Sequence, residues 1–408
     1  MEKIRAVWNE YPRQFWLLIV ASFIDRLGGA LVFTFFSLYI TDKFDVGLTQ
    51  AGYVFAVFGV TGFIGSIVGG SLSDRYGRKG VIVIGLVASA ALNLMMGLAG
   101  SLNILVMVAM VAGLFGELSR PAHQAMIADI VPEDKHAEGY AAMRVANNTA
   151  IVLGPIIGGL LLNVLPYIVL FIADSVTSLI MAGIVLFALV ETHRTTEEEK
   201  ANEDFSLRSY ITILQNPVFV AFLVIVTVVG FVYFQMYTTL PVFLRDVHGI
   251  PESGYAYILS MNAAMVVLLQ FRVTRWFREH VPLLVMAGGT VLYAVGFAMY
   301  GFVGNYVMFM VAMAAITVGE MMMMPTGKAF VTKIAPPNRR ARYMAVYSFT
   351  FAIPASFATL PAGLVLDNFN PNVLWMVCGV VALVFAGAFV QLYTVVREQS
   401  RAAVAEAA

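Results

Sequence analysis

Charged side chains occur in the middle of long apolar runs in this sequence. Asp25 and Arg26 lie in the first run, Glu117 and Arg120 in the fourth, and Glu320 in the tenth. A charge at the centre of a bilayer costs at least about 2.5–3.5 kcal/mol on insertion scales, so such residues are usually functional. Carboxylates at this depth can bind and release protons or pair with a cation, which makes these acids the first candidates for chemistry.

Glu117 and Arg120 are three residues apart, a spacing that places both side chains on one face of a helix. Gln124 continues this face one turn beyond Arg120. The spacing predicts an ion pair in which Arg120 holds an acid ionised. The alternative is a static buried pair that only fixes packing.

Soft and aromatic side chains accompany these charges. Methionine adapts to ligands of many shapes, and the faces of aromatic rings attract cations. A methionine run, Met321–Met324, directly follows Glu320. Plain apolar packing is the alternative explanation for this run. The candidates for substrate binding are Asp25, Phe33, Glu117, Gln124, Tyr233, Gln235, Tyr237, Glu320 and Met324.

Other kinds of chemistry lack support. No phosphate-binding Gly-x-x-x-x-Gly-Lys-Ser/Thr motif is present, and none of the five histidines forms a pair at metal-ligand spacing. The Gly-x-Ser-x-Gly motif of serine hydrolases is also missing. We therefore expect no cofactor, no metal and no enzyme activity.

Composition predicts a membrane protein. The chain has 408 residues, of which 60% are hydrophobic and 12% charged, and its mean hydropathy is +0.82. A soluble domain has about 25% charged residues. The apolar runs do not alternate with a period of two, so the spans are helices rather than strands of a barrel. A net charge of zero without a basic tract excludes nucleic acid as an expected partner.

Twelve spans can be assigned, and the first is expected to be a retained helix rather than a cleaved signal. A polar stretch separates two halves, which gives a six-helix bundle over 1–190, a cytoplasmic linker over 191–215 and a second bundle over 216–408. The expected spans are 14–40, 48–73, 80–100, 103–130, 137–163, 167–190, 216–244, 253–274, 282–301, 305–333, 340–366 and 372–396.

The two halves repeat a pattern of residues. A Gly-Glu pair, two prolines and a tyrosine occur in the same order in each half, from the fourth span into the fifth and from the tenth span into the eleventh. Internal duplication of a helical unit is typical of secondary transporters with a site near the midplane. The matched residues are Gly116, Glu117, Pro121, Pro132 and Tyr140 in the first half and Gly319, Glu320, Pro325, Pro336 and Tyr343 in the second.

Basic residues set the expected orientation. With both termini in the cytoplasm, only Lys43 and Arg245 of the 25 Lys and Arg residues fall outside, and four lie within spans. Cytoplasmic loops carry the excess of basic residues in membrane proteins. We therefore expect a multi-pass protein of the cell (inner) membrane with both termini in the cytoplasm.

The loop after the second span resembles the signature of the major facilitator superfamily, G-x-L-x-D-R-x-G-R-[KR]. The match is complete at Gly70, Leu72, Asp74, Arg75, Gly77, Arg78 and Lys79. In that family this loop latches the two halves on the cytoplasmic side, and Asp129 is a candidate partner for Arg75. The alternative is that these charges only set the topology.

The fifth span resembles the antiporter motif of the twelve-helix drug:H⁺ antiporters, G-x-x-x-G-P-x-x-G-G. The matching residues are Gly154, Pro155, Gly158 and Gly159, while Ala150 replaces the first glycine. Ordinary tight helix packing is the alternative. A third family motif would place an arginine at Ala109, four residues before Gly113, and its absence weakens a proton mechanism copied from the family.

The resemblance implies two pseudo-symmetric six-helix bundles with the first, fourth, seventh and tenth spans around a central cavity. Asp25, Glu117 and Arg120 would then face one another, with Glu320 opposite, as the proton-coupling set. The implied function is proton-coupled efflux of lipophilic or cationic compounds. The chain is expected to work as a monomer, and its expected partners are protons, a small lipophilic substrate and the lipid bilayer.

Other functions are compatible with the sequence. A facilitator for a sugar, an amino acid or a lysolipid is one rival. A membrane sensor that does not transport is another, and an intramembrane enzyme would need a nucleophile or metal constellation that the sequence lacks.

Overall fold

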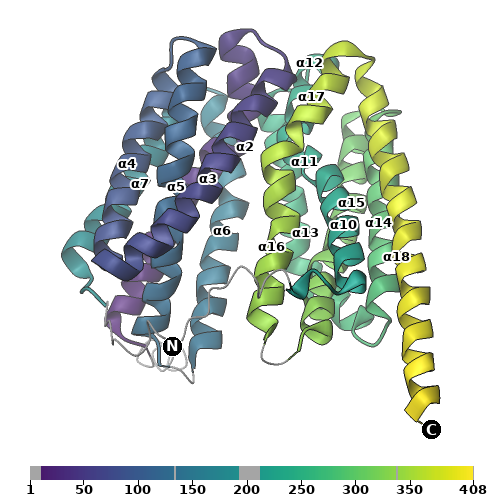
Figure 1. The fold of residues 1–408 in the computed structure, drawn as a ribbon. Coiled ribbons are helices and arrows are strands. Elements are labelled where there is room, and N and C mark those ends of the chain that lie inside the picture. The colour runs from purple at the N-terminus through teal and green to yellow at the C-terminus, as the bar shows by residue number, and fades with distance from the viewer. Residues whose placement is uncertain (1–10, 133–134, 193–211, 337–338, 408) are drawn as a thin grey trace. The chain divides into compact units, whose positions relative to one another are not determined.

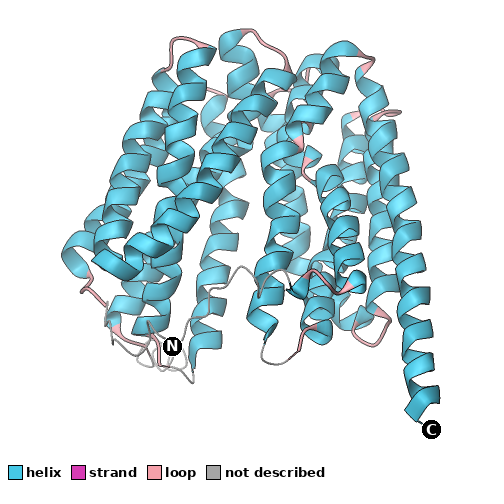
Figure 2. Cartoon of the chain, viewed as in Figure 1, coloured by secondary structure: helices cyan, strands magenta, loops and turns pink. Residues whose placement is uncertain are grey.

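The computed structural model describes residues 11–132, 135–192, 212–336 and 339–407. Every element in these ranges is a helix, and Figure 2 shows the helices joined mostly by short loops. Twelve of the described helical segments are long and apolar enough to cross a membrane, which confirms the predicted all-α fold. The helices labelled in Figure 1 are α2 (Arg13–Phe44), α3 (Leu48–Tyr76), α4 (Arg78–Leu98), α5 (Leu102–Ile130), α6 (His136–Leu162), α7 (Ile168–Ala188), α10 (Pro217–Tyr233), α11 (Gln235–Thr238), α12 (Leu240–His248), α13 (Glu252–Phe277), α14 (Pro282–Tyr300), α15 (Tyr306–Ile334), α16 (Arg340–Phe357), α17 (Thr359–Asn368) and α18 (Pro371–Ala407).

Two expected spans are interrupted. The predicted 216–244 helix divides into α10, α11 and α12, and the predicted 340–366 helix divides into α16 and α17 at Ala358. The Gln235 amide donates to the carbonyl oxygens of Phe231 at 2.8 Å and Ala358 at 3.0 Å. Backbone groups freed at a helix break inside a membrane need such partners. Gln235 therefore stabilises both interruptions.

The chain forms two compact units. In the first, α2 packs on α6 and α7, while α4 packs on α5 and α7; in the second, α10 packs on α16 and α18, while α14 packs on α15 and α18. Each helix of the second set stands six spans after its counterpart in the first, so the repeat in sequence is also a repeat in packing. Most of the predicted linker, residues 193–211, lies outside the described residues.

Small residues bring α3 against α5 in the first unit. A side-chain carbon added at Gly65 or Gly69 would overlap the backbone of Leu114 or Leu118. Glycines at this spacing let two helix backbones approach closely. The contact holds the part of α5 that carries Glu117 in a fixed place.

Candidate functional site

Glu320 lies at the centre of a polar cluster inside the second unit. Its Oε1 atom accepts a hydrogen bond from the Tyr233 hydroxyl at 3.0 Å, and its Oε2 atom accepts one from the Asn262 amide at 2.9 Å. The same amide donates to the Thr317 hydroxyl at 2.9 Å. Three helices, α10, α13 and α15, thus converge on one carboxylate. Both donors are neutral, so the hydrogen bonds orient the carboxylate without balancing its charge.

Two further tyrosines extend this cluster. The hydroxyls of Tyr233 and Tyr237 are 3.1 Å apart. The Tyr293 ring of α14 stacks on the Tyr233 ring, with centroids 5.8 Å apart and planes 26° apart. The result is an aromatic surface of several rings directly beside Glu320.

A small cavity adjoins the aromatic surface. It lies among α10, α14, α15 and α16, and its lining includes Tyr233, Tyr293, Met324 and Tyr347. Met323 and Met324 of the methionine run line this cavity, whereas Met321 and Met322 do not. The predicted substrate residues Tyr233 and Met324 therefore meet at one place.

Glu117 and Arg120 form the ion pair that their spacing predicts. Arg120 donates to Glu117 Oε2 at 3.0 Å, and the two side chains are 66% and 35% exposed. Arg26 of α2 is near enough for its charge to be attracted by Glu117 and repelled by Arg120, and its side chain is exposed. Charged side chains at this depth usually face protein or a water-filled path rather than lipid. The first unit therefore presents one acid and two bases on a shared polar face.

The structure corrects the expected orientation of Asp25. Its carboxylate accepts a hydrogen bond from Ser178 of α7 at 2.8 Å instead of facing Glu117 and Arg120. Asp174 of α7 lies nearby and accepts from the Asn93 amide of α4. Successive residues point about 100° apart around a helix. Arg26 therefore points toward Glu117 and Arg120, the direction that was predicted for Asp25.

The remaining predicted substrate residues lie apart from these clusters. Gln235 is buried, and its amide bonds to backbone and to the Thr239 hydroxyl, so its polar atoms are satisfied within the protein. Phe33 is 41% exposed and meets Phe55 edge-on. Gln124 is exposed, and its carbonyl accepts a hydrogen bond from Tyr140.

Several residues of these clusters were absent from the sequence-based site, Asp174 and Thr317 among them. Asn93, Ser178, Asn262 and Tyr293 are buried or half-buried within spans. A carboxamide inside an apolar run is itself a signal, because a polar group in hydrocarbon needs a partner. Asn93 and Asn262 could have been found in this way, whereas Ser178 and Tyr293 occur too commonly in spans to stand out.

The sequence is similar to a known family of proteins and to several of its curated members. The family model described as "Major Facilitator Superfamily" matches residues 18–359 and 283–407. The chain belongs to this superfamily. A curated relative from Planococcus maritimus named "Na(+), Li(+), K(+)/H(+) antiporter" is 27% identical over 86% of this chain and 89% of its own length. "Multidrug resistance protein MdtH" of Shigella boydii is 21% identical over 90% of this chain and 91% of its own length.

Two solved transporter structures share the fold of this chain. The nucleoside transporter NupG aligns with a TM-score of 0.82 at 14% identity, covering 93% of this chain and all of that chain. A POT family transporter aligns with a TM-score of 0.74 at 16% identity. At these identities the likeness establishes the fold alone.

The superfamily signature loop holds an ion pair that differs from the predicted one. Arg78 rather than Arg75 pairs with Asp129, at 2.5 Å. Arg75 is exposed and lies over the Tyr76 ring. The three-residue step from Arg75 to Arg78 crosses a helix break at Gly77, whose φ of 96° redirects the chain. The predicted partner was therefore assigned to the wrong arginine.

A second contact fixes the same loop. The Glu191 carboxylate accepts from the backbone N–H groups of Arg78 at 3.0 Å and Lys79 at 3.1 Å. An acid at a helix N-terminus satisfies free N–H groups and complements the positive end of the helix dipole. The Lys79 ammonium also donates to the Leu189 carbonyl at 2.8 Å. Gly70 lies in α3 near Pro121 of α5, and the side chain of Asp74 lies outside the described residues.

The antiporter motif in α6 is a packing surface. A side-chain carbon at Gly154 would overlap Ala30 of α2, and one at Gly158 would overlap the Phe35 ring. Gly159 lies against Ala256, and Pro155 lies inside the helix. The motif therefore allows close contact of α6 with α2, the helix that carries Asp25 and Arg26.

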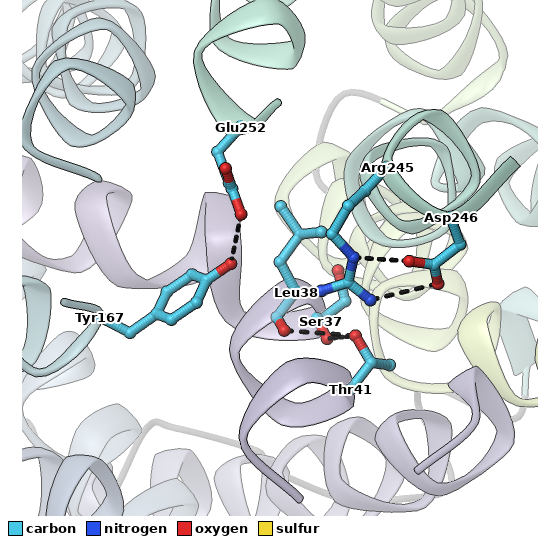
Figure 3. A network of polar contacts seen from close by, with 7 residues as sticks. All are labelled: Ser37, Leu38, Thr41, Tyr167, Arg245, Asp246 and Glu252. Carbon is cyan, nitrogen blue, oxygen red and sulfur yellow. Dashed lines mark hydrogen bonds and ion pairs between the residues drawn. The ribbon is translucent and has the colours of Figure 1, made fainter. Parts of the chain in front are cut away.

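Polar contacts also occur at the helix ends drawn in Figure 3. Tyr167 donates to the Glu252 carboxylate at 2.8 Å, and Glu252 lies in the first turn of α13. The Arg245 guanidinium makes two bonds to Asp246, at 2.6 and 3.1 Å. Arg245, one of the two basic residues predicted to lie outside, is thereby partly neutralised by its neighbour.

Proposed function

We propose that the chain is a proton-coupled antiporter that exports small lipophilic cations across the cell membrane by alternating access. Glu320 is the carboxylate that exchanges a proton for the cationic solute. The observation that carries this proposal is that the two side chains that donate hydrogen bonds to Glu320, Tyr233 and Asn262, are neutral. A buried carboxylate that no base pairs with among the described residues gains most from binding either a proton or a cation.

The surroundings of Glu320 support a lipophilic solute. The rings of Tyr233 and Tyr237 present π faces that attract organic cations, and Met324 offers an adaptable apolar contact. The names of the relatives, an antiporter and multidrug resistance proteins, agree with this class of activity. In the first unit, Glu117, Arg120 and Arg26 provide a charged face that accompanies the exchange.

Ligand binding to the purified chain tests this proposal. Ethidium should raise the unfolding temperature of the wild type in detergent, and Glu320→Gln should weaken that effect more than it weakens the effect of a neutral dye of similar size. Equal losses for both dyes would assign Glu320 to packing.

We further propose that both termini face the cytoplasm, that the chain works as a monomer, and that the loop around Arg78 and Asp129 acts as the cytoplasmic latch.

Exchange of Na⁺, Li⁺ or K⁺ for protons is the second candidate. The observation that favours it is the meeting of Asp25 and Asp174 with the oxygen of Ser178 and the amide of Asn93, since alkali cations prefer oxygen ligands. The relative from Planococcus maritimus is named as an antiporter of Na⁺, Li⁺ and K⁺ for H⁺. Proton movement driven by NaCl in vesicles, and lost in Asp25→Asn, would select this candidate.

A further inference from the structure

Arg26 is a charged side chain near the middle of a span, and it lacks a partner among the described residues. It lies within three residues of the midpoint of α2 (Arg13–Phe44), or about 4 Å from it along the helix axis. Its guanidinium makes neither a hydrogen bond nor an ion pair with any described residue. A guanidinium keeps its charge and carries five N–H donors in a planar fork. Charged groups at this depth pair with one another or line the path of a solute or ion.

The acids that act on Arg26 are bonded elsewhere. Glu117 Oε2 accepts a hydrogen bond from Arg120 at 3.0 Å, and Asp25 Oδ1 accepts one from Ser178 at 2.8 Å. Both carboxylates attract Arg26 from a distance, without forming an ion pair with it. The N–H donors of Arg26 therefore remain unused within the described part of the chain.

Arg120 is the other base on this face of the first unit. The charges of Arg26 and Arg120 repel each other, and both side chains are exposed, that of Arg120 to 66%. Lipid does not accept exposed charges at this depth, so the two side chains face a polar path that a solute can enter. An oxyanion between them would offset the repulsion and accept hydrogen bonds from both guanidinium forks, whose geometry matches carboxylate and phosphate. The two arginines are thus complementary to an anionic group.

An aromatic ring lies on the same face of α2 as Arg26. Phe33 follows Arg26 by seven residues, which places the two side chains on one face of the helix, about 10 Å apart along its axis. The Phe33 ring is 41% exposed and meets the Phe55 ring edge-on, with centroids 6.0 Å apart. Gly29 and Ala30 lie between Arg26 and Phe33 and have no long side chain. This face therefore offers a charged end and an apolar end with small residues between them.

We propose that the first unit binds an amphipathic organic anion, with its carboxylate between Arg26 and Arg120 and its apolar body against Phe33. This site goes beyond the proposed function, which concerns a cation and Glu320 in the second unit. The group that the arginines recognise is an oxyanion, so the phosphate of a lipid headgroup shares the relevant chemistry with the carboxylate of a solute. The exposed ring of Phe33, about 10 Å from the charge, favours an aromatic carboxylate.

Calorimetric titration of the purified chain in a neutral detergent tests this site. The probes are 4-biphenylcarboxylate and the neutral 4-biphenylmethanol, which has nearly the same size. Arg26→Gln should weaken binding of the carboxylate about tenfold or more and change binding of the alcohol less than about twofold. Arg272→Gln removes an exposed arginine of α13 in the second unit, so it is the matched control and should change neither affinity. Equal losses for both probes in Arg26→Gln, or no loss for either, would overturn the site.

Glu117→Gln tests the site in the opposite direction. The change frees Arg120 from its ion pair, so the carboxylate should bind about threefold more tightly or better. A variant that fails to fold cannot produce tighter binding. Phe33→Ala should weaken binding of both probes to a similar extent, because it removes an apolar contact and no charge. Carboxylate binding that is unchanged or weaker in Glu117→Gln, or unchanged binding of both probes in Phe33→Ala, would contradict the proposed geometry.

Competition separates the two sources of the oxyanion. Dihexanoyl phosphatidic acid and dihexanoyl phosphatidylcholine carry the same acyl chains but differ in the net charge of the headgroup. Binding of 4-biphenylcarboxylate to the lipid-free wild type supports the solute site. A wild type that binds the phosphatidic acid but not the carboxylate would overturn it and assign the arginines to a lipid headgroup. Ethidium binding in the same preparation reports on Glu320, so a missing ethidium effect with carboxylate binding intact would overturn only the proposed function.

Discussion

The hydroxyl of Tyr233 on α10 donates a 3.0 Å hydrogen bond to the carboxylate of Glu320 on α15. The two residues are 87 positions apart, yet they lie in the same compact unit. The bond joins an aromatic surface to an acid that its neutral donors leave uncompensated. Any solute cation that approaches Glu320 at this side therefore also meets the rings of Tyr233 and Tyr237.

Asn262 should matter for stability as well as for charge. Replacing it with Leu removes the donor to both Glu320 and Thr317. Leaving buried polar atoms without partners should lower the free energy of unfolding by roughly 1–3 kcal/mol. Thermal unfolding in detergent measures this change. Asn262→Asp is the comparison, since it keeps the size but adds a charge, and a wild-type unfolding temperature in Asn262→Leu would contradict the assigned role.

The Arg78–Asp129 pair should be the one that controls the signature loop. Arg78→Ala should change the populations of the conformational states, whereas Arg75→Ala should have little effect, because Arg75 is exposed. Distances between spin labels on the two units report those populations. The exchanged double variant Arg78→Asp with Asp129→Arg should restore part of the wild-type distribution. A larger effect of Arg75→Ala than of Arg78→Ala would refute this assignment.

Glu191 should stabilise the N-terminus of α4. Glu191→Gln keeps the shape of the side chain but removes the charge that accepts from the N–H groups of Arg78 and Lys79. Loss of a helix cap costs about 0.5–2 kcal/mol. Amide hydrogen exchange in the first turn of α4 should become faster. Exchange that stays at the wild-type rate in Glu191→Gln would show that the cap contributes little.

His248 should make the stability of the folded chain depend on pH. Partial burial lowers the pKa of His248 below its ordinary value of 6.5. The centroid of the His248 ring is 4.9 Å from that of Phe243 and 4.8 Å from that of Phe309. The unfolded chain then binds a proton at a higher pH than the folded chain does, so folding loses stability as pH falls below about 6.5. Unfolding temperatures of the wild type should drop between pH 7 and pH 5 more than those of His248→Gln. Parallel curves for the two proteins would contradict this prediction.

Local spacing predicted some of the site, and tertiary packing decided the rest. Glu117 and Arg120 could be paired from sequence because three residues nearly complete one helical turn. The partners of Glu320 could not, because Tyr233 and Asn262 come from other helices whose rotation no local pattern fixes. Asp25 and Arg26 show the same limit, since both were found but their directions depended on how α2 turns toward α7.

The fold was more predictable than the site. Long apolar runs define spans by their length alone, and the described residues contain the expected twelve. The breaks that end α10 and α16 were missed, since their cost is offset by the Gln235 amide, a tertiary contact. The same contact explains why Gln235, predicted to bind substrate, is used for structure.

Proton flux in vesicles tests the central claim most directly. Purified chain is reconstituted with a pH-sensitive dye inside, ethidium is added on one side, and the change in internal pH is followed for the wild type and Glu320→Gln. The account predicts ethidium-driven proton movement in the wild type and its loss in Glu320→Gln, with Asp25→Asn still active. Proton movement at the wild-type rate in Glu320→Gln would contradict it.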